Sequence, residues 1–201
     1  MTMKTIIAET AAHIPLCVID EPKTALILGD AINKALFEEI AKHKIAVTVC
    51  SFHGADFDCG EEIVWKSGSI AINVESLQGA FDAIVDLRTQ KPNADEARTL
   101  LGKLAKDGVL LKAFDALERE QLKVYQSCRV VVPCALSAFA PLDGSIIGYV
   151  FVSQTARPTA NLNIQRADML DNLSYYSVDT HNAAFALPPR ILAQFDDLIK
   201  N

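Results

Sequence analysis

Five residues that could take part in binding or catalysis follow short apolar runs. They are Gly29 and Asp30 after the run 25–28, Ser51 after the run 45–49, Glu75 after the run 70–74, and Asp86 after the run 83–85. Continuous apolar runs of this length are typical of buried parallel strands, because helices cover both faces of such a sheet. Ligands of open α/β sheets bind outside the carboxyl ends of the strands. The five residues therefore lie where a ligand of such a sheet would bind, but this architecture alone leaves the ligand's chemistry open.

The histidines and cysteines form no familiar metal or nucleophile motif. The four histidines are scattered along the sequence, at His13, His43, His53 and His181. His53 has acidic residues and Cys59 nearby, but no second histidine or cysteine lies at a metal-binding spacing. The segment Ser51-Phe52-His53 lacks the glycines of a nucleophile elbow. We expect no metal site, and we interpret residues 54–60 as a solvated loop.

Helical patterns alternate with the apolar runs. The run 25–28 leads through a tight turn into apolar residues at four-residue spacing, which predicts a strand followed by a helix. Asn93 is placed to cap a helix over 93–104, which gives way near Asp107-Gly108 to a strand over 109–111. The remaining elements expected are a helix over 116–126 and strands over 130–132 and 146–152. The pattern predicts about seven strands, with the closing pair antiparallel because no helix-length connection joins it.

Length and composition favour one α/β domain. The chain has 201 residues, half of them apolar, which suffices for one substantial core. We divide it into an N-terminal segment (1–22), an αβ core (23–154) and a C-terminal tail packed on the core (155–201). Central strands should be buried on both faces, which predicts nearly full burial of six residues. These are Leu26, Ile27, Ile84, Val85, Leu110 and Val131.

Charge and cysteine usage narrow the partners. The formal charge of -6 offers no attraction to phosphate backbones, so no nucleic-acid partner is expected. Five cysteines without a C-x-x-C pair fit a reducing, cytoplasmic location. No run approaches the roughly 18 apolar residues of a membrane span, so no membrane partner is expected either.

A resemblance to a known family enters at the C-terminal end. The segment from Tyr175-Tyr176 through His181 to Ala183-Ala184-Phe185-Ala186-Leu187-Pro188 resembles the C-terminal signature of spermidine synthases. The segment 12–28 resembles the family's approach to its first Rossmann strand, and 104–110 the step into its fifth strand. Pro141, Gly144 and Gly148 resemble the turn between its last two strands. The likeness spans about residues 9–199 and begins where the family's small N-terminal β-domain would end.

The resemblance implies a Rossmann-like fold of the S-adenosylmethionine-dependent transferase type, mostly parallel with an antiparallel last strand. It also implies a role for each candidate. Gly29 and Asp30 occupy the turn that admits the donor, where the family has several glycines. Ser51 ends the strand that normally carries the ribose-binding carboxylate, and Glu75 matches the acidic residue beside the adenine. Asp86 matches the aspartate that activates the attacking amine.

The match at Asp86 is uncertain by one residue, since strict alignment places Leu87 there. A shift of one residue in an extended segment turns the side chain to the opposite face, so either Asp86 faces the cleft or it is a strand-end carboxylate. The family's second aspartate in this loop matches Gln90 or Thr89. Arg88 brings a positive charge where a polyamine brings its own, which disfavours binding.

The resemblance predicts transfer of an aminopropyl group from decarboxylated S-adenosylmethionine to putrescine, in polyamine biosynthesis. The ligands would be a small-molecule polyamine and an adenosyl donor that acts as co-substrate, with no resident cofactor. Because the site motifs are eroded, activity should be weak or lost, and a non-catalytic nucleoside-binding or protein-interaction paralogue is the alternative. We also expect a homo-oligomer, because a missing N-terminal domain would uncover apolar surface around 6–17.

Overall fold

The computed structural model describes residues 2–29, 32–58, 63–129, 132–141 and 148–200. Seven strands form one sheet in the order β3-β2-β1-β4-β5-β7-β6. The strands are β1 (Thr24–Leu28), β2 (Ala46–Ser51), β3 (Ile63–Ser67), β4 (Phe81–Asp86), β5 (Leu104–Phe114), β6 (Ala135–Phe139) and β7 (Gly148–Ser153). β1 to β5 pair in parallel, whereas β7 is antiparallel to both β5 and β6. This confirms the predicted mostly parallel sheet with an antiparallel last strand.

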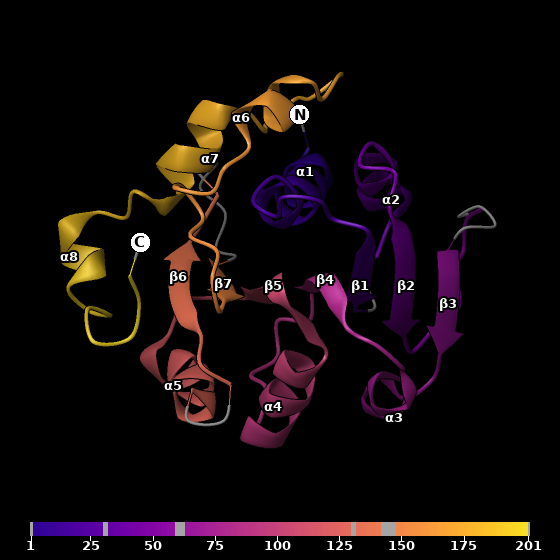
Figure 1. Ribbon diagram of the computed structural model, residues 1–201, viewed down its shortest axis with the longest axis horizontal. Coiled ribbons are helices and arrows are strands. Elements are labelled where there is room, and N and C mark those ends of the chain that lie inside the picture. Colours follow the sequence, from indigo (N-terminus) through magenta and orange to yellow (C-terminus); the bar gives the residue numbers. More distant parts are fainter. Residues whose placement is uncertain (1, 30–31, 59–62, 130–131, 142–147, 201) are drawn as a thin grey trace.

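Helices cover both faces of the sheet (Figure 1). They are α1 (Met3–Leu16), α2 (Lys34–Ala41), α3 (Ile70–Ser76), α4 (Ala94–Gly102), α5 (Arg119–Cys128), α6 (Ile164–Asp168), α7 (Val178–Phe185) and α8 (Pro189–Leu192). Helices α1 and α2 lie on one side together with α6 and α7 of the tail, and α3, α4 and α5 lie on the other. Within the described residues, no helix is long and apolar enough to span a membrane.

Two apolar cores result, one on each face. Ile27, Val85 and Leu111 pack toward α1 and α2, and their strand neighbours Ile84 and Leu110 pack toward α4 and α5. Of the predicted core residues, Leu26, Ile27, Ile84, Val85 and Leu110 are at most 2% exposed. Val131 lies outside the described residues. The prediction of buried central strands is confirmed for the residues that the structure describes.

The prediction of a strand over 70–74 is wrong, because this run forms helix α3. Ile70 and Val74, four residues apart, are buried, whereas Ile72 between them is 67% exposed. This is helical spacing, which a run of only five residues does not reveal. The third strand is instead β3, an edge strand with a mixed apolar and polar sequence.

Several element boundaries also differ from the prediction. Asn93 caps α4 as expected, with Oδ1 accepting from the N–H of Glu96 at 2.8 Å, but the helix ends at Gly102 and Leu104 already belongs to β5. The helix predicted from 116 begins at Arg119. Strand β6, over Ala135–Phe139, was not predicted. The strand predicted over 130–132 falls mainly on residues outside the described part of the chain.

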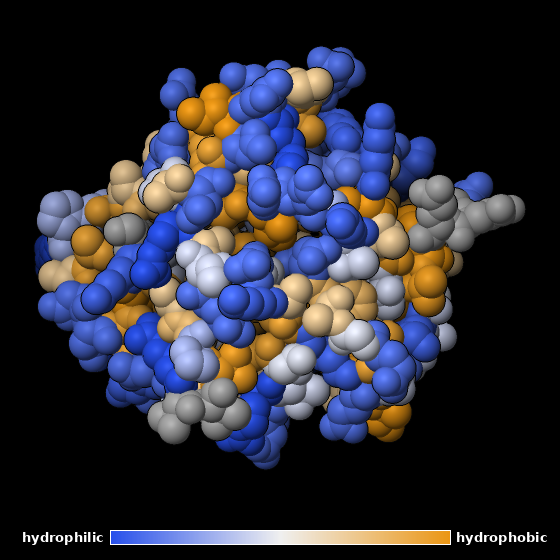
Figure 2. Space-filling model, viewed as in Figure 1, coloured by the Kyte–Doolittle hydropathy of each residue, from blue (hydrophilic) through white to orange (hydrophobic). Residues whose placement is uncertain are grey.

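The N-terminal segment 6–17 is a helix whose apolar side chains are buried within the chain itself. Ile6, Ile14 and Leu16 are at most 4% exposed. The expected uncovered apolar surface around 6–17 is therefore wrong. Figure 2 shows hydrophilic residues over most of the visible face, with apolar residues in separate patches. Self-association remains a prediction, but it is no longer supported by an uncovered apolar surface around 6–17.

Candidate functional site

The carboxyl ends of four strands are aligned in one row across the sheet. Leu28 of β1 is in register with Cys50 of β2 and with Asp86 of β4, and Asp86 with Lys112 of β5. The candidate residues Gly29, Ser51 and Asp86 thus lie at the same edge, as predicted from the strand ends. Asp30 lies outside the described residues.

Gly29 is where the first strand leaves the sheet. Its φ of 146° lies in a region that residues with a side chain rarely adopt. A Cβ at this position would be 3.4 Å from the Cβ of Leu87, so the chain after β1 runs close to the chain after β4. Gly29 therefore has a structural reason to be glycine at the edge where ligands of this fold bind.

A cavity of about 380 Å³ opens beside this edge. Phe52 contributes from the end of β2, the start of α3 contributes Ser69, and Leu87 and Arg88 contribute from the end of β4. The remaining lining residues are Ile70, Ala71, Thr89 and Gln90. Half of the lining residues are apolar and the others offer hydroxyl, amide and guanidinium groups, a mixture that occurs in small-molecule sites. Leu87 lines this cavity, whereas Asp86 does not.

Asp86 lies behind the cavity, where Arg88 holds its carboxylate. The side chain of Asp86 is fully buried. Arg88 donates from Nε to Oδ1 and from Nη2 to Oδ2, both at 2.8 Å, and its backbone N–H donates to Oδ1 at 3.1 Å. A third donor, Nη1, contacts Oε1 of Glu96 on α4 at 2.5 Å. One guanidinium therefore joins two carboxylates.

Electrostatics keep Arg88 charged. The pKa of Arg88 is raised: its burial favours the neutral form, but the hydrogen bonds and charges of Asp86 and Glu96 outweigh that effect. A bidentate arginine–carboxylate pair is among the strongest hydrogen-bonded contacts in proteins. The Asp86 carboxylate is consequently fully engaged within the chain.

A second cation, Lys112, lies beneath the same carboxylate. Its side chain is 1% exposed, and Nζ is 3.7 Å from Oδ2 of Asp86. Nζ also donates to the backbone carbonyls of Arg88 and, at 3.0 Å, Ala113. Burial lowers the pKa of Lys112, and the charge of Asp86 opposes that shift. A buried lysine needs such partners, because an unpaired ammonium is costly to remove from water.

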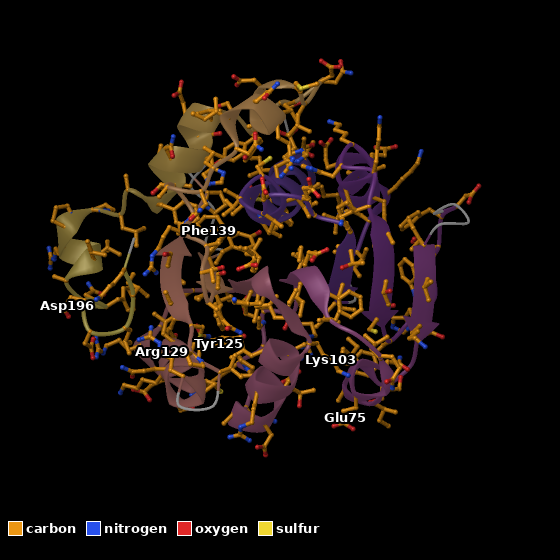
Figure 3. All side chains as sticks on the ribbon, in the orientation of Figure 1. Glu75, Lys103, Tyr125, Arg129, Phe139 and Asp196 are labelled. Carbon is orange, nitrogen blue, oxygen red and sulfur yellow. The ribbon has the colours of Figure 1, made fainter. Side chains whose placement is uncertain are left out.

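A second cavity, of about 240 Å³, lies on the other side of Arg88, between α3 and α4. Arg88, Ile70 and Ala71 line both cavities, so Arg88 forms part of the wall between them. Glu75 and Glu96 line only this second one. Figure 3 places Glu75 on the outer side of α3. Glu75 sits within a helix, so the premise that it follows a strand is wrong, while its role at the adenine stays a prediction.

Ser51 ends β2, but its hydroxyl is used locally. Oγ donates to the carbonyl of His53 and accepts from Nε1 of Trp65 at 3.0 Å. The side chain is almost fully buried and lines neither of the two cavities. In this structure the hydroxyl thus fixes the turn after β2.

The histidines are less scattered in space than in sequence. Nδ1 of His13 lies 2.9 Å from Nε2 of His43, and Nε2 of His13 lies 2.8 Å from a carboxylate oxygen of Glu39. His181 is buried in the tail, within 2.9 Å of both the Tyr176 hydroxyl and the Pro158 carbonyl. Among the described residues, no group of three or more potential ligands could hold a metal ion. Cys59 falls outside them.

The charged cluster of Asp86, Arg88, Glu96 and Lys112 was only partly visible in the sequence. Arg88 was recognised as an unfavourable charge for a polyamine, but its partners were not. Lys112 gives the clearest missed signal, because a lysine inside the apolar run of β5 must have a counter-ion on a neighbouring strand. Tyr125 of α5 lies between that helix and the sheet (Figure 3), and its buried hydroxyl has no hydrogen-bond partner among the residues that the structure describes.

No protein-family profile matches the chain. Sequence comparison finds a polyamine aminopropyltransferase of Helicobacter pylori (strain HPAG1), 30% identical over 125 residues, covering 60% of this chain and 47% of that protein. A spermine synthase of Arabidopsis thaliana is 24% identical over 221 residues, covering 90% of this chain and 60% of that protein. The chain thus spans about half the length of the curated relatives it matches.

Comparison with solved structures also finds spermidine synthases. Spermidine synthase from Thermotoga maritima superposes with a TM-score of 0.77 at 20% identity, covering 98% of this chain and 75% of that one. Human methyltransferase-like protein 13, solved with SAH, gives a TM-score of 0.57 at 13% identity, with 92% of each chain covered. These likenesses establish the Rossmann-like fold of S-adenosylmethionine-dependent transferases. Together with the sequence matches they confirm the resemblance of this chain to the spermidine synthases, which are polyamine aminopropyltransferases.

Proposed function

We propose that the chain is a spermidine-synthase-like aminopropyltransferase of polyamine biosynthesis, with slow transfer from decarboxylated S-adenosylmethionine to putrescine. The observation that carries the proposal is the 380 Å³ cavity at the carboxyl ends of β2 and β4, bounded by Leu87 and Arg88. Ligands of this fold class bind at that edge. A spermidine synthase of the same fold has been solved with the transition-state analogue AdoDATO.

The reaction is a displacement at carbon. A putrescine nitrogen attacks the aminopropyl carbon bonded to the sulfonium, a C–N bond forms, the C–S bond breaks, and 5'-methylthioadenosine leaves with the electron pair on sulfur. The attacking nitrogen must be unprotonated, and it releases one proton after the attack. In this proposal Asp86 accepts that proton, which is the work of a general base.

The cluster around Asp86 supports a slow reaction. Arg88 occupies both carboxylate oxygens of Asp86, and Leu87 rather than Asp86 borders the cavity. A well-placed general base typically contributes about 10²–10⁴ to a rate, and Asp86, which does not border the cavity, should supply only part of that factor. The donor also lacks a carboxylate at Ser51 for its ribose, which should weaken binding by about ten- to a hundredfold.

The test is calorimetry followed by an assay. The full chain is titrated with decarboxylated S-adenosylmethionine and with 5'-methylthioadenosine, and spermidine formation is then measured for the chain and for Asp86→Asn. We expect weak nucleoside binding and slow spermidine formation that Asp86→Asn abolishes. Arg98→Gln, on the exposed side of α4, is the matched control and should form spermidine at the unaltered rate. Absence of nucleoside binding would contradict the proposal and favour a non-catalytic paralogue.

Two further expectations belong to this proposal. We expect the protein to act in the cytoplasm, because its cysteines do not suggest a disulfide framework. We also expect self-association. Light scattering over a range of concentrations tests it, and a monomer at the highest concentration would contradict it.

A further inference from the structure

The strand-end cluster concentrates four charged groups around one carboxylate. Asp86 and Lys112 are at most 1% exposed, Arg88 is 17% exposed and Glu96 is 27% exposed. Formally the two acids and the two bases cancel. A cleft that should attract diammonium ligands through its carboxylates therefore presents no net negative charge from this cluster.

Arg88 occupies the carboxylates in the way a ligand ammonium would. Three of its N–H donors, Nε, Nη1 and Nη2, are directed at Asp86 and Glu96. Its guanidinium also lies in the wall between the 240 Å³ and the 380 Å³ cavities. An ammonium that approaches the buried Asp86 meets the bound guanidinium of Arg88 first, and like charges at short range repel.

We propose that Arg88 determines the charge preference of the cleft, so that the cleft binds uncharged adenine nucleosides more tightly than ligands with ammonium groups. The inference rests on the proposed function for the adenine-binding part and names the residue that limits acceptor affinity. The apolar residues Phe52, Ile70 and Leu87 of the cavity suit an uncharged heterocycle, since burying it there costs no charge desolvation.

The experiment compares one neutral and one dicationic probe on three variants. The full chain, Arg88→Gln, Arg98→Gln and the double variant Asp86→Asn/Arg88→Gln are titrated with 5'-methylthioadenosine and with putrescine. Arg88→Gln frees a buried carboxylate, and we expect its putrescine affinity to rise about tenfold, because a hydrogen bond to a charged group is worth about one decade. The affinity for 5'-methylthioadenosine should change less than about twofold, because that ligand brings no charge to the carboxylate.

The other two variants distinguish the effect of the Arg88 charge from the effect of the space that its side chain fills. Arg98 is on the same helix as Glu96 and pairs with the exposed Asp95 at 2.7 Å, so Arg98→Gln should leave putrescine affinity unchanged. The double variant opens the same space without the Asp86 charge, so it should not gain putrescine affinity. The double variant removes both members of the ion pair, so it can still be measured if Arg88→Gln alone folds poorly. A thermal unfolding transition comparable to that of the unaltered chain shows which variants are folded.

Two results would overturn the assignment. One is unchanged putrescine affinity in folded Arg88→Gln, and the other is an equal gain in the double variant, which would show that space rather than charge limits the acceptor. The gain should also shrink as salt is raised from about 0.05 to about 0.5 M, since screening weakens charge attraction. If no form binds 5'-methylthioadenosine, the proposed function fails, whereas the putrescine titrations still decide the role of Arg88.

Discussion

Two buried polar clusters hold this protein together in different ways. Where the tail packs on α1, the fully buried Glu9 accepts hydrogen bonds from the backbone N–H groups of Ser174, Tyr175 and Tyr176 at 2.7–2.8 Å. At the end of β4, Asp86 is instead held mainly by side chains, those of Arg88 and Lys112, with one backbone N–H, that of Arg88. One carboxylate is satisfied by neutral groups fixed in the main chain, and the other mainly by charged side chains.

The difference separates a structural cluster from one that can be changed. Backbone donors cannot rotate away, so Glu9 fixes the position of the tail, together with the hydrogen bond between Tyr176 and His181. The charged contacts of Arg88 come from its side chain, so its charge can be removed by substitution without breaking a backbone hydrogen bond of the sheet. Substitutions in the tail cluster should therefore reduce stability, while those at the strand end should mainly alter ligand preference.

The largest loss of stability is expected for Glu9→Ala. Three backbone N–H groups would lose their acceptor, and a buried unsatisfied group costs about 1–3 kcal/mol, so the free energy of unfolding should fall by about 4 kcal/mol. Urea unfolding followed by circular dichroism measures it. Glu38→Ala, whose side chain is 59% exposed, is the control and should change stability by less than about 0.5 kcal/mol. A similar small change in Glu9→Ala would refute the structural role of the cluster.

The next expected effect is a loss of folding stability in acid, caused by the buried histidines His43 and His181. Burial lowers the pKa of His43 to about 3 and that of His181 to about 4, so both stay neutral in the folded chain. Both values lie below the ordinary 6.5, and the unfolded chain therefore takes up protons first as the pH falls. The free energy of unfolding should be highest near pH 7 and should fall below about pH 6.5. At pH 5 the loss should be about 2 kcal/mol per histidine.

The variant His181→Gln tests that decline. It removes one of the two titrating groups, so its loss of stability between pH 7 and pH 5 should be smaller than that of the unaltered chain. His53→Gln, at an exposed loop position, is the control and should leave the decline unchanged. Equal slopes in all three proteins would contradict the assignment to the buried histidine.

Lys112→Met should reduce the free energy of unfolding by less than Glu9→Ala does. Methionine fills similar space among apolar neighbours, and Asp86 keeps its bidentate contact with Arg88. Two carbonyls, of Arg88 and Ala113, lose their donor. We expect a loss of about 1.5 kcal/mol in urea unfolding, well below the about 3–5 kcal/mol for leaving a buried charge unpaired. Lys106→Met, at an exposed position of the same strand, is the control. A loss above about 3 kcal/mol would mean that Arg88 alone does not compensate Asp86.

The sequence predicted the central part of the fold well, because buried parallel strands have an unambiguous pattern. The runs that became β1 and β4 are apolar throughout, and Asn93 carries a clear capping signal. The errors fall where short segments permit two structures. The run 70–74 fits a strand or a helix, and β3 at the edge of the sheet lacks a fully apolar pattern.

The site was predictable in position but not in detail. Alignment of strand ends placed Gly29, Ser51 and Asp86 at one edge without knowledge of the strand order. The orientation of Asp86 depended on a single residue of register, which pattern matching does not determine. The contact of Arg88 with Glu96 depends on how α4 packs on the sheet, and such long-range packing is not encoded in local spacing.

The smallest effect is expected for Glu96→Gln, which tests whether the strand-end cluster is as adjustable as the comparison implies. Glu96 is 27% exposed, and Arg88 would keep both of its contacts with Asp86. The free energy of unfolding should therefore fall by less than about 1 kcal/mol, and the difference should shrink at high salt because water reaches the pair. Asp95→Asn, one residue away with a side chain 90% exposed, is the matched control and should have almost no effect in urea unfolding at either salt concentration. A loss as large as that of Glu9→Ala would show that Glu96 fixes Arg88 as rigidly as the backbone fixes Glu9. In that case the guanidinium could not act as a changeable counter-ion, and the strand end would be a second structural cluster.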